Sequence, residues 1–323
     1  MRDNPKVDAV ITWVDGDDPR HIAKREAFGN KKILKVDDVA GSTRYRSVGE
    51  ILYCVASLNR FAPWLNKIYI VTDEQNPNVE PFLEQHFPNG HIPVEVVDHK
   101  VIFRGYEQCL PTFNSISIES MTWRIPGLSE HFIEFNDDLI LSAPTKFEDF
   151  FTERGVVCYG RKYSSLLTRL LGLTKYRKDG SKRVTFKQTM LNAKDLISKS
   201  GKFIKLYHTP KALLRSVYEE YFTAHPDHLV RNIEHRFRHH TQYNPQEIQY
   251  LLLSDRGRCT LRKAYDELLY LKPNKSSGYI AEKLAMFDKL STHKFGCFNS
   301  LDQASEEDRE MTIEWIERRI GLR

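Results

Sequence analysis

Two adjacent carboxylates interrupt an apolar run near the middle of the chain. The stretch FIEFNDDLIL, residues 132–141, reads as a buried strand except for Asn136, Asp137 and Asp138. An isolated charge in a core costs roughly several kcal/mol, so such residues are normally paired, bound to a metal or placed at an edge. Successive side chains of a strand point to opposite faces, so we expect the strand to end or bend here. One aspartate would then reach a metal, and the other would orient a ligand, a water or a basic partner.

Three earlier apolar runs also end in acids, which are Asp15, Asp73 and Asp98. Aspartate is common in turns and as a helix N-cap, and that alternative stays open for each of them. Four acidic strand ends in succession favour an acidic pocket, because ligands of open α/β sheets bind at the carboxyl ends of the strands. Carboxylate oxygens are the ligands that Mg²⁺ and Mn²⁺ prefer, so the pattern predicts a site for one of these ions.

Strands and helices alternate along residues 1–145. This alternation predicts an α/β fold with a mainly parallel, Rossmann-like sheet and helices on both faces. The predicted strands cover residues 7–14, 67–73, 93–99 and 131–137, and the predicted helices cover 48–62, 79–87 and 114–125.

The alternation breaks over residues 146–235. A hairpin is expected at 176–186, and the segment 161–187 carries nine Lys and Arg residues against one acid. Such a run is either a solvated face or a surface that attracts an anionic glycan, a lipid-linked acceptor or a membrane. The helices predicted in the second half of the chain cover residues 186–199, 210–224, 226–240, 245–254 and 305–320.

Two short segments of the second half carry further candidates for chemistry. His208 stands before the predicted helix 210–224, and an imidazole titrates near neutrality. In the predicted helix 226–240, helical spacing places Arg238 on one face with two histidines, His235 and His239. A guanidinium group is well suited to bind phosphate because its donors are planar and paired.

Composition limits the class of protein. The net charge of +5 over 323 residues does not indicate a nucleic-acid binder. No apolar run approaches about 20 residues and the first residues lack a signal-peptide core, so we expect no transmembrane helix and no leader. The five cysteines are scattered without a C-x-x-C pair, which is typical of a reducing cytosol.

Several sequence blocks resemble signatures of the Stealth family. VDAVITWVDGDDP at 7–19 is similar to its first block, and segments 42–77, 110–120 and 125–141 are similar to its second. HTPKALL and FRHH resemble the third block, and FGCFNSLD resembles the fourth more weakly. The chain departs from the family at Ile51 and Ala56, where basic residues are common, and at Ser300, where the family usually has aspartate; Asp302 follows two positions later.

The resemblance implies a GT-A-like fold and the transfer of a sugar-1-phosphate from a nucleotide-diphosphate sugar, with a UDP-sugar favoured, to a glycan or lipid-linked glycan hydroxyl. It further implies capsule or exopolysaccharide synthesis in the cytoplasm, with peripheral contact at the inner membrane face. Residues 1–145 would form the nucleotide-sugar-binding core, 146–235 a basic and helical insertion, and 236–323 a helical part that completes the site. A metal-dependent glycosyltransferase and a non-catalytic glycan-binding relative stay as alternatives.

The resemblance also implies roles for individual residues. Asp137, together with Asp138 or Asp15, would hold Mg²⁺ or Mn²⁺ and complete the catalytic acids. His208 would be the general base. The residues expected to bind the transferred phosphate or the nucleotide sugar are Arg44, Arg46, Arg238, Asn114, Ser115 and Asn136.

Overall fold

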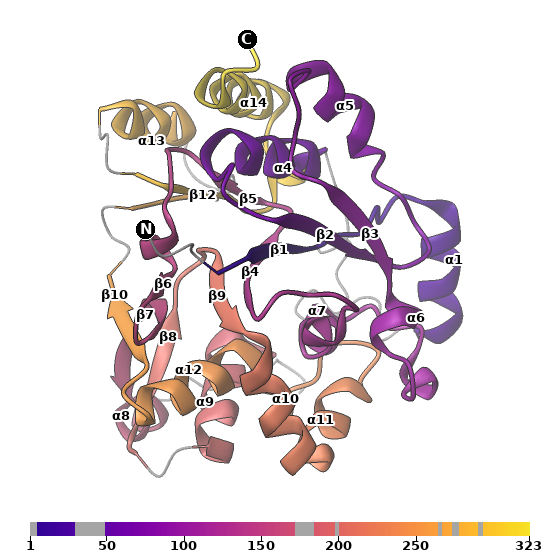
Figure 1. Ribbon diagram of the computed structural model, residues 1–323, viewed down its shortest axis with the longest axis vertical. Coiled ribbons are helices and arrows are strands. Elements are labelled where there is room, and N and C mark those ends of the chain that lie inside the picture. Colours follow the sequence, from indigo (N-terminus) through magenta and orange to yellow (C-terminus); the bar gives the residue numbers. More distant parts are fainter. Residues whose placement is uncertain are drawn as a thin grey trace.

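A five-stranded sheet forms the centre of the protein (Figure 1). The computed structural model describes residues 5–29, 49–171, 184–197, 200–263, 267–272, 278–289 and 293–323. The sheet has the order β3-β2-β1-β4-β9, in which the first four strands are parallel and β9 is antiparallel to β4. The predicted α/β class and mainly parallel sheet are therefore confirmed. The strands are β1 (Val7–Thr12), β2 (Lys67–Thr72), β3 (Val94–Asp98), β4 (His131–Asn136) and β9 (Lys211–Leu214).

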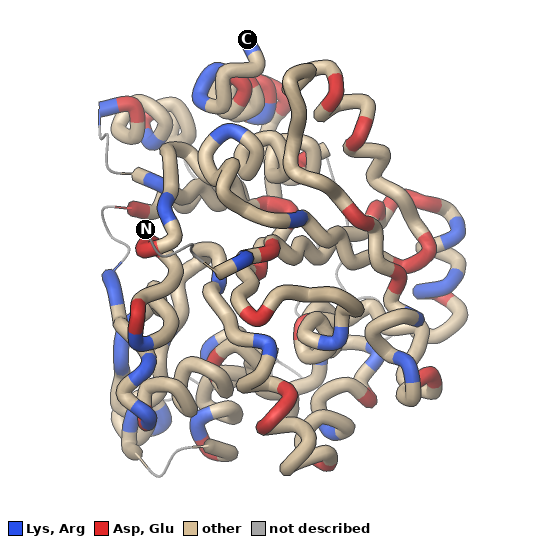
Figure 2. Tube along the Cα trace, viewed as in Figure 1, with Lys and Arg blue, Asp and Glu red and all other residues tan. Residues whose placement is uncertain are grey.

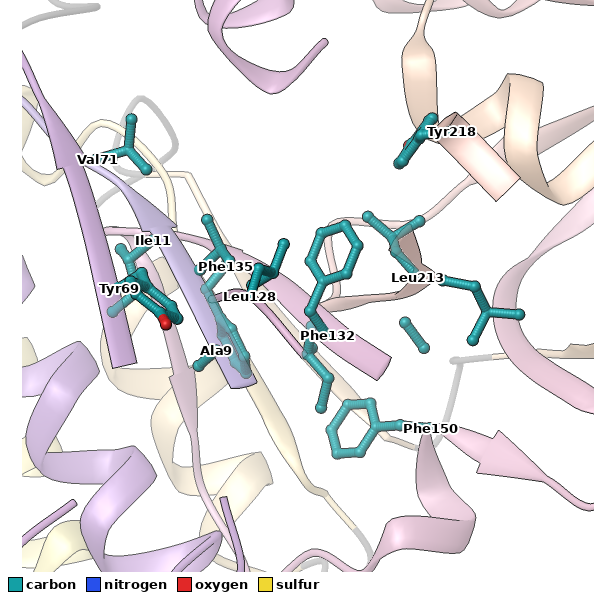
Figure 3. Packing of buried hydrophobic residues seen from close by; sticks show 14 of the residues in the cluster. Ala9, Ile11, Tyr69, Val71, Leu128, Phe132, Phe135, Phe150, Leu213 and Tyr218 are labelled. Atoms are coloured by element: carbon teal, nitrogen blue, oxygen red, sulfur yellow. The ribbon is translucent and has the colours of Figure 1, made fainter. Parts of the chain in front are cut away.

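The central strands are buried on both faces, as their continuous apolar runs require. Ala9, Val10 and Ile11 in β1 have no solvent exposure. Figure 3 shows Ile11, Tyr69, Phe132 and other side chains of this cluster packed together across the sheet. In Figure 1, α4 (Glu50–Phe61) and α5 (Val79–His86) lie on one side of the sheet, and α7 (Ser115–Glu119) lies on the other.

Two smaller sheets flank the central one. In the first, β7 (Gly155–Ser164) lies between β6 (Phe151–Thr152) and β10 (Cys259–Arg262), and its last residues pair with β8 (Lys202–Leu206). In the second, β12 (Phe295–Phe298) lies between β11 (Leu268–Leu271) and β5 (Leu139–Leu141). The chain thus passes from the central sheet into another sheet directly after β4.

The remaining helices complete the outer layers. Several predicted helices are confirmed, including α4, α5, α9, α12 and α14; Ser305 caps α14 by accepting a hydrogen bond from the Asp308 amide at 3.1 Å. Besides α4, α5 and α7, the helices of the described residues are α1 (Pro19–Phe28), α6 (His99–Ile102), α8 (Ser165–Leu170), α9 (Phe186–Ile197), α10 (Arg215–Ala224), α11 (Pro226–Ile233), α12 (Pro245–Asp255), α13 (Tyr279–Asp288) and α14 (Glu306–Ile320). Short 3-10 turns lie at Glu107–Cys109, Thr122–Arg124, Phe147–Asp149 and Leu301–Gln303.

Three predicted helices are wrong in part. Residues 210–224 begin as strand β9, because the apolar run after Lys211 pairs with β4, and only α10 is helical. The predicted helix 114–125 is divided into α7 and the turn Thr122–Arg124. The predicted helix 226–240 ends at Ile233, and the reason lies in the hydrogen bonds that follow.

Beyond Ile233 the chain folds back on itself. The buried Asn232 side chain donates to the Ser120 hydroxyl at 2.7 Å and to the Tyr243 carbonyl at 3.1 Å. The His239 amide donates to Gln242 Oε1 at 2.9 Å. These bonds replace the helical bonds that the segment 234–240 would otherwise make. The prediction that His235, Arg238 and His239 share one face of a helix is therefore wrong. The rings of His235 and His239 nevertheless stack, with their centroids 4.4 Å apart.

Some predictions fall outside the described residues. Arg44, Arg46 and most of the expected hairpin 176–186 lie there. Among the described helices, none is long and apolar enough to cross a membrane. The division of the chain into domains at residues 145 and 235 stays a prediction. Strand β9, from the predicted region 146–235, pairs with β4, from the predicted core 1–145.

Candidate active site

An open cleft of about 480 Å³ lies at the carboxyl edge of the parallel strands. Residues from β1, β2, β4 and their following turns line it, together with residues that follow β8, β11 and β12. Its size suits a small-molecule ligand. The charged and histidine side chains that line it are His21, Glu50, Asp73, His99, Asp137, Asp138, His208, Arg238, Lys272 and Asp302.

Asp137 and Asp138 form the turn between β4 and β5. β4 stays in the central sheet up to Asn136, and β5 pairs with β12 in another sheet. The strand therefore ends at the acids, as predicted, and both side chains line the cleft together with Asn136. A change of sheet at this point removes the conflict between two adjacent charges and a continuous core strand.

One carboxylate oxygen of Asp138 accepts hydrogen bonds, and the other is buried without a donor among the described residues. Its Oδ2 accepts weak hydrogen bonds from Cys297 Sγ at 3.7 Å and Asn299 Nδ2 at 3.5 Å, and its backbone carbonyl accepts from the Phe298 amide at 2.9 Å. Its Oδ1 is buried and has no hydrogen-bond partner among the described residues. A buried carboxylate oxygen without a donor needs a proton or a cation.

The charge of this turn is uncompensated. Burial and the neighbouring Asp138 and Glu50 carboxylates raise the pKa of Asp137 well above its ordinary value. Burial likewise raises the pKa of Asp138, against the opposing hydrogen bonds from Asn299 and Cys297. A divalent cation would reverse both shifts, since it favours the ionised carboxylates.

The donor set fits an ion that takes few protein ligands. In the part of the chain that the structure describes, no three His, Cys, Asp or Glu side chains form a complete metal cluster. Mg²⁺ is usually held by one or two carboxylates and completes its shell with water and substrate phosphates. The open Oδ1 of Asp138, with Asp137 beside it, matches that requirement.

His208 also lines the cleft. Its ring stacks on Tyr270 at a centroid distance of 4.7 Å and lies 5.9 Å from Phe186. Enclosure in the wall and the nearby ammonium groups of Lys211, Lys272 and Lys205 lower the pKa of His208 to about 4. Neutral imidazole, the form that accepts a proton, therefore predominates at neutral pH.

Arg238 reaches the cleft from the segment after α11. Its Nη2 donates to the Ser115 hydroxyl at 2.7 Å, and both residues line the cleft. Asn114 does not line the cleft, because it is buried and bonded. Its Oδ1 accepts from the Ile116 amide at 3.2 Å, and its Nδ2 donates to the His235 carbonyl and Gln242 Oε1, both at 2.9 Å. Asn114 therefore fixes α7 against the Arg238 segment, and its role in substrate binding stays a prediction.

The strand-end acids divide into two groups. Asp15 and Asp98 have the bonding of ordinary turn acids: Asp15 accepts from the Asp17 amide at 3.0 Å, and Asp98 caps α6 through the Lys100 amide at 2.8 Å. Neither lines the cleft. Asp73 does line it, and Lys24 Nζ lies 3.3 Å from both of its oxygens. Of the four acidic strand ends, Asp73 and the Asp137–Asp138 turn line the cleft, whereas Asp15 and Asp98 do not, so the expected pocket of four strand-end acids is wrong in part.

Among the other residues that line the cleft, Glu50 and Lys272 were not predicted from the sequence, whereas Asp302 was noted there. Glu50 opens α4 after Gly49, whose φ of +89° is in the left-handed region that glycine favours. Asp302 lines the same cleft as Asp138, so a carboxylate from the fourth block is present despite Ser300. Lys272 follows β11 and supplies a second cation. Gly49, directly before the predicted helix, is a sequence signal that could have pointed to Glu50 as the first residue of α4. No sequence motif surrounds Lys272.

A group of buried polar and titratable side chains surrounds Glu134 and Lys211. Gln246 Nε2 donates to Glu134 Oε2 at 2.6 Å and to Glu119 Oε2 at 3.0 Å, and Thr122 donates to Glu134 at 2.5 Å. Burial, with the nearby Glu119, raises the pKa of Glu134 to about 8. Lys211 Nζ donates to the carbonyls of Tyr207 and Thr209, both at 2.5 Å, on either side of His208. This group fixes the wall that carries the candidate base.

The parallel sheet and the acidic cleft at its carboxyl edge define an α/β protein with a candidate site for a phosphorylated ligand and a divalent cation. The chain belongs to the Stealth family. The model of Stealth protein CR1, conserved region 1, matches residues 5–33, and that of Stealth protein CR2, conserved region 2, matches residues 44–159. The third and fourth blocks stay resemblances of sequence.

Curated relatives carry phosphotransferase names. The chain is 34% identical over 212 residues to a capsular polysaccharide phosphotransferase of Streptococcus pneumoniae, covering 66% of this chain and 60% of that protein. It is 32% identical over 324 residues to an exopolysaccharide phosphotransferase of Mycobacterium tuberculosis, covering 97% of this chain and 56% of that protein. The chain thus spans about three fifths or less of the length of these relatives.

Two solved structures illustrate distant similarity. Mouse xyloside xylosyltransferase 1 is 12% identical, with a TM-score of 0.39 over 92% of this chain and 98% of that one. The glycosyltransferase GlyE of Streptococcus pneumoniae is 11% identical, with a TM-score of 0.41 over 99% of this chain and 63% of that one.

Proposed function

We propose that the protein transfers a sugar-1-phosphate from a nucleotide-diphosphate sugar to a hydroxyl of a glycan, forming a phosphodiester. The observation that carries this proposal is the meeting of three distant segments in one cleft: the Asp137–Asp138 turn, His208 and Arg238. Their chemistry matches phosphoryl transfer, which needs in-line positioning and neutralisation of phosphate charge more than covalent help. The names of the Stealth relatives support the same reaction class.

The lining residues divide the work of this reaction. Arg238, oriented by Ser115, would bind the oxygens of the transferred phosphate, and Lys272 would add a second positive charge. Asp138 and Asp137 would hold Mg²⁺ or Mn²⁺, which when bound supplies charge neutralisation at the diphosphate. Neutral His208 would accept the proton of the acceptor hydroxyl as that oxygen attacks phosphorus. The bond from phosphorus to the nucleotide's bridging oxygen breaks, and a nucleoside monophosphate leaves.

Finer features of the function belong to the same proposal. The donor would be a UDP-sugar, and the acceptor a glycan or lipid-linked glycan of a capsule or exopolysaccharide. The reaction would take place in the cytoplasm, with peripheral contact at the inner face of the membrane. Arg44 and Arg46 would add to the phosphate site, and Asn136 to the donor site.

A glycosyltransferase reaction is the competing function, because an acidic, metal-binding cleft would serve it as well. That reaction breaks the bond between sugar carbon and oxygen and releases a nucleoside diphosphate. A non-catalytic glycan-binding protein would release neither nucleotide. The presence of Asp302 in the cleft speaks against this last alternative, since the carboxylate of the fourth block is retained.

One experiment separates these functions. Purified protein is incubated with a panel of nucleotide sugars, an acceptor glycan and Mg²⁺, and the released nucleotide is identified. We expect a nucleoside monophosphate, no turnover in EDTA, and recovery when Mg²⁺ or Mn²⁺ is restored. Release of a nucleoside diphosphate would replace the proposal with glycosyl transfer, and full activity in EDTA would remove the metal role of Asp137 and Asp138.

A further inference from the structure

Helix α8 exposes leucines and buries polar residues. Leu166, Leu167, Leu170 and Leu171 are between 57% and 74% exposed, and they are the four most exposed large hydrophobic side chains in the described part of the chain. Ser165 and Thr168, in contrast, are buried. Spacings of one and four residues place the four leucines on one side of this short helix. The usual burial pattern of a surface helix is thus inverted.

Hydrogen bonds hold α8 in this orientation. The Ser165 amide and hydroxyl both donate to the Gly201 carbonyl, at 2.8 and 3.0 Å. The Thr168 hydroxyl donates to the Ser164 carbonyl at 2.7 Å, and the Ser164 hydroxyl accepts from the Leu167 amide at 3.3 Å. The polar face is therefore fixed to the start of β8, and the apolar face is turned outward.

The ribbon that carries α8 is basic. Segments 155–171 and 200–206 contain five Lys and Arg residues and no acid, and Figure 2 shows blue positions gathered along β7, β8 and β10. Arg161 and Lys205 face each other across the paired strands, and both cations lie over the ring of Tyr163, at 5.6 and 6.0 Å from its centroid. Lys202 is a further exposed cation, opposite Ser164.

We propose that this surface, formed by the four leucines of α8 with Arg161, Lys202 and Lys205, docks on an anionic lipid bilayer. Leucine side chains enter the boundary between headgroups and acyl chains, and neighbouring cations contact acidic headgroups, as in interfacial helices of peripheral proteins. Charge complementarity favours this occupant, because Arg161, Lys202 and Lys205 border the apolar patch and match acidic lipid, and the nearby acid Asp195 of α9 is already paired with Arg169 of α8.

The proposed surface leads directly to the cleft. β8 ends at Leu206, and His208 follows two residues later on the cleft wall. A chain docked through the far end of the β7–β8 ribbon would therefore hold the cleft near the membrane. The inference rests on the membrane contact named in the proposed function and deepens it by assigning the surface that makes this contact; it does not depend on the transferase chemistry.

Vesicle binding tests the inference without an activity assay. Co-sedimentation is measured with vesicles of phosphatidylcholine alone and of phosphatidylcholine with phosphatidylglycerol. The variants are L166Q with L170Q, which removes apolar contact, and K202E with K205E, which reverses charge. Matched controls are M286Q and K289E, since Met286 and Lys289 are also exposed but lie at α13.

We expect wild-type protein to bind the acidic vesicles and not the neutral ones. The leucine variant should lose at least about tenfold in binding, and the double charge reversal should lose more than about tenfold, at roughly fivefold for each charge removed. Both controls should bind like wild type, and circular dichroism should show that every variant is folded.

Three results would overturn the inference. Wild-type protein could ignore acidic vesicles, or the leucine variant could bind them as well as wild type. Sedimentation velocity supplies the third: a wild-type dimer that the leucine variant converts to monomer would assign the leucines to a second copy of the chain. None of these results bears on nucleotide release, so the transferase proposal and this one fail separately.

Discussion

At the scale of single residues, neutral His208 and the carboxyl of Asp138 have different roles in the cleft. His208 is set for proton acceptance, because its wall neighbours are cations and its pKa is lowered. Asp138 is set for cation binding, because one of its oxygens is buried without a partner among the described residues. Each of these assignments leads to a substitution with a distinct result.

Replacing His208 with asparagine removes the titrating group and keeps a hydrogen-bond donor. The turnover rate should fall by roughly 10²–10⁴, while nucleotide-sugar binding changes little. Because the pKa of His208 is lowered, the acidic limb of the wild-type kcat/KM profile should lie below pH 6.5 and should vanish in the variant. His225→Asn is the control, since His225 does not line the cleft. A variant that keeps the acidic limb would show that another residue accepts the proton.

Replacing Asp138 with asparagine removes one ionisable group of the turn. Mg²⁺ should raise the melting temperature of wild-type protein, and this shift should disappear in Asp138→Asn. Without Mg²⁺, the variant should melt at the same temperature or higher, because the raised pKa values of Asp137 and Asp138 show that the ionised pair is unfavourable. Asp227→Asn, on α11, is the control. If Mg²⁺ raised the melting temperature of Asp138→Asn as much as that of wild type, the ion would bind at another site.

At the scale of elements, the sequence predicted the strands better than the helices of the second half. Strands β1 to β4 are recognisable because each is an apolar run ended by acids, and parallel pairing follows from the helices between them. The same logic failed at residues 210–224. The three residues after Lys211, Ala-Leu-Leu, fit the hydrophobic period of a helix as well as that of a strand. Only their pairing with β4, about 80 residues earlier in the chain, makes them a strand.

The residues of the candidate site could be predicted from the sequence where acidic side chains directly follow a strand. Asp137 and Asp138 were found in this way, and so was Asp73. Asp15 carries the same signal and is a turn acid, since an acid that binds a cation and one that binds an amide look alike in sequence. His208 and Arg238 came from the resemblance to the Stealth blocks, and the helix expected around Arg238 was wrong. The bonds of Asn232 and Gln242 that replace this helix join segments distant in sequence.

Lys211 links the sheet to the wall that carries His208. Replacing it with methionine removes the bonds to the Tyr207 and Thr209 carbonyls and the charge that helps to lower the pKa of His208. The pKa of His208, measured by NMR titration of its imidazole, should therefore rise, and turnover should fall by up to roughly 10²-fold as the ring loses its position. Lys211→Arg retains the cation and should keep the pKa low.

Loss of stability alone would not move that pKa, because the titration reads only the folded protein. An unchanged His208 pKa in Lys211→Met, with the fold intact, would show that Lys211 supports the loop without affecting the base.

At the scale of the whole molecule, buried groups of both signs are kept neutral. The buried carboxyls Glu134 and Glu247 have raised pKa values, to about 8 for Glu134, mainly because of burial. The buried imidazoles of His21 and His99 have lowered pKa values, to about 4 for His99, again mainly because of burial. These shifts act on stability in different pH ranges, and the ranges follow from linkage.

Above its unfolded pKa near 4.5, Glu134 keeps a proton in the folded protein that the unfolded chain loses, so stability falls as pH rises toward 8. The histidines act below 6.5, where the unfolded chain takes up protons that the folded protein refuses, so they lower stability as pH falls. Between pH 6.5 and 8 the histidine effect is over, and the carboxyl effect remains.

We therefore expect the free energy of unfolding to fall as pH rises from 6.5 to 8. Glu134 should contribute roughly 2 kcal/mol over this interval, from about 1.4 kcal/mol per pH unit for one retained proton. Glu134→Gln keeps the shape of the neutral acid without its proton, so its urea-denaturation midpoint should change less with pH than that of wild type. Glu130→Gln is the control, because Glu130 lies just before β4 and its carboxylate accepts hydrogen bonds from Ser216 at the protein surface. Equal pH dependence of wild type and Glu134→Gln would mean that Glu134 is ionised in the folded protein, with Lys211 on the neighbouring strand as its counter-charge.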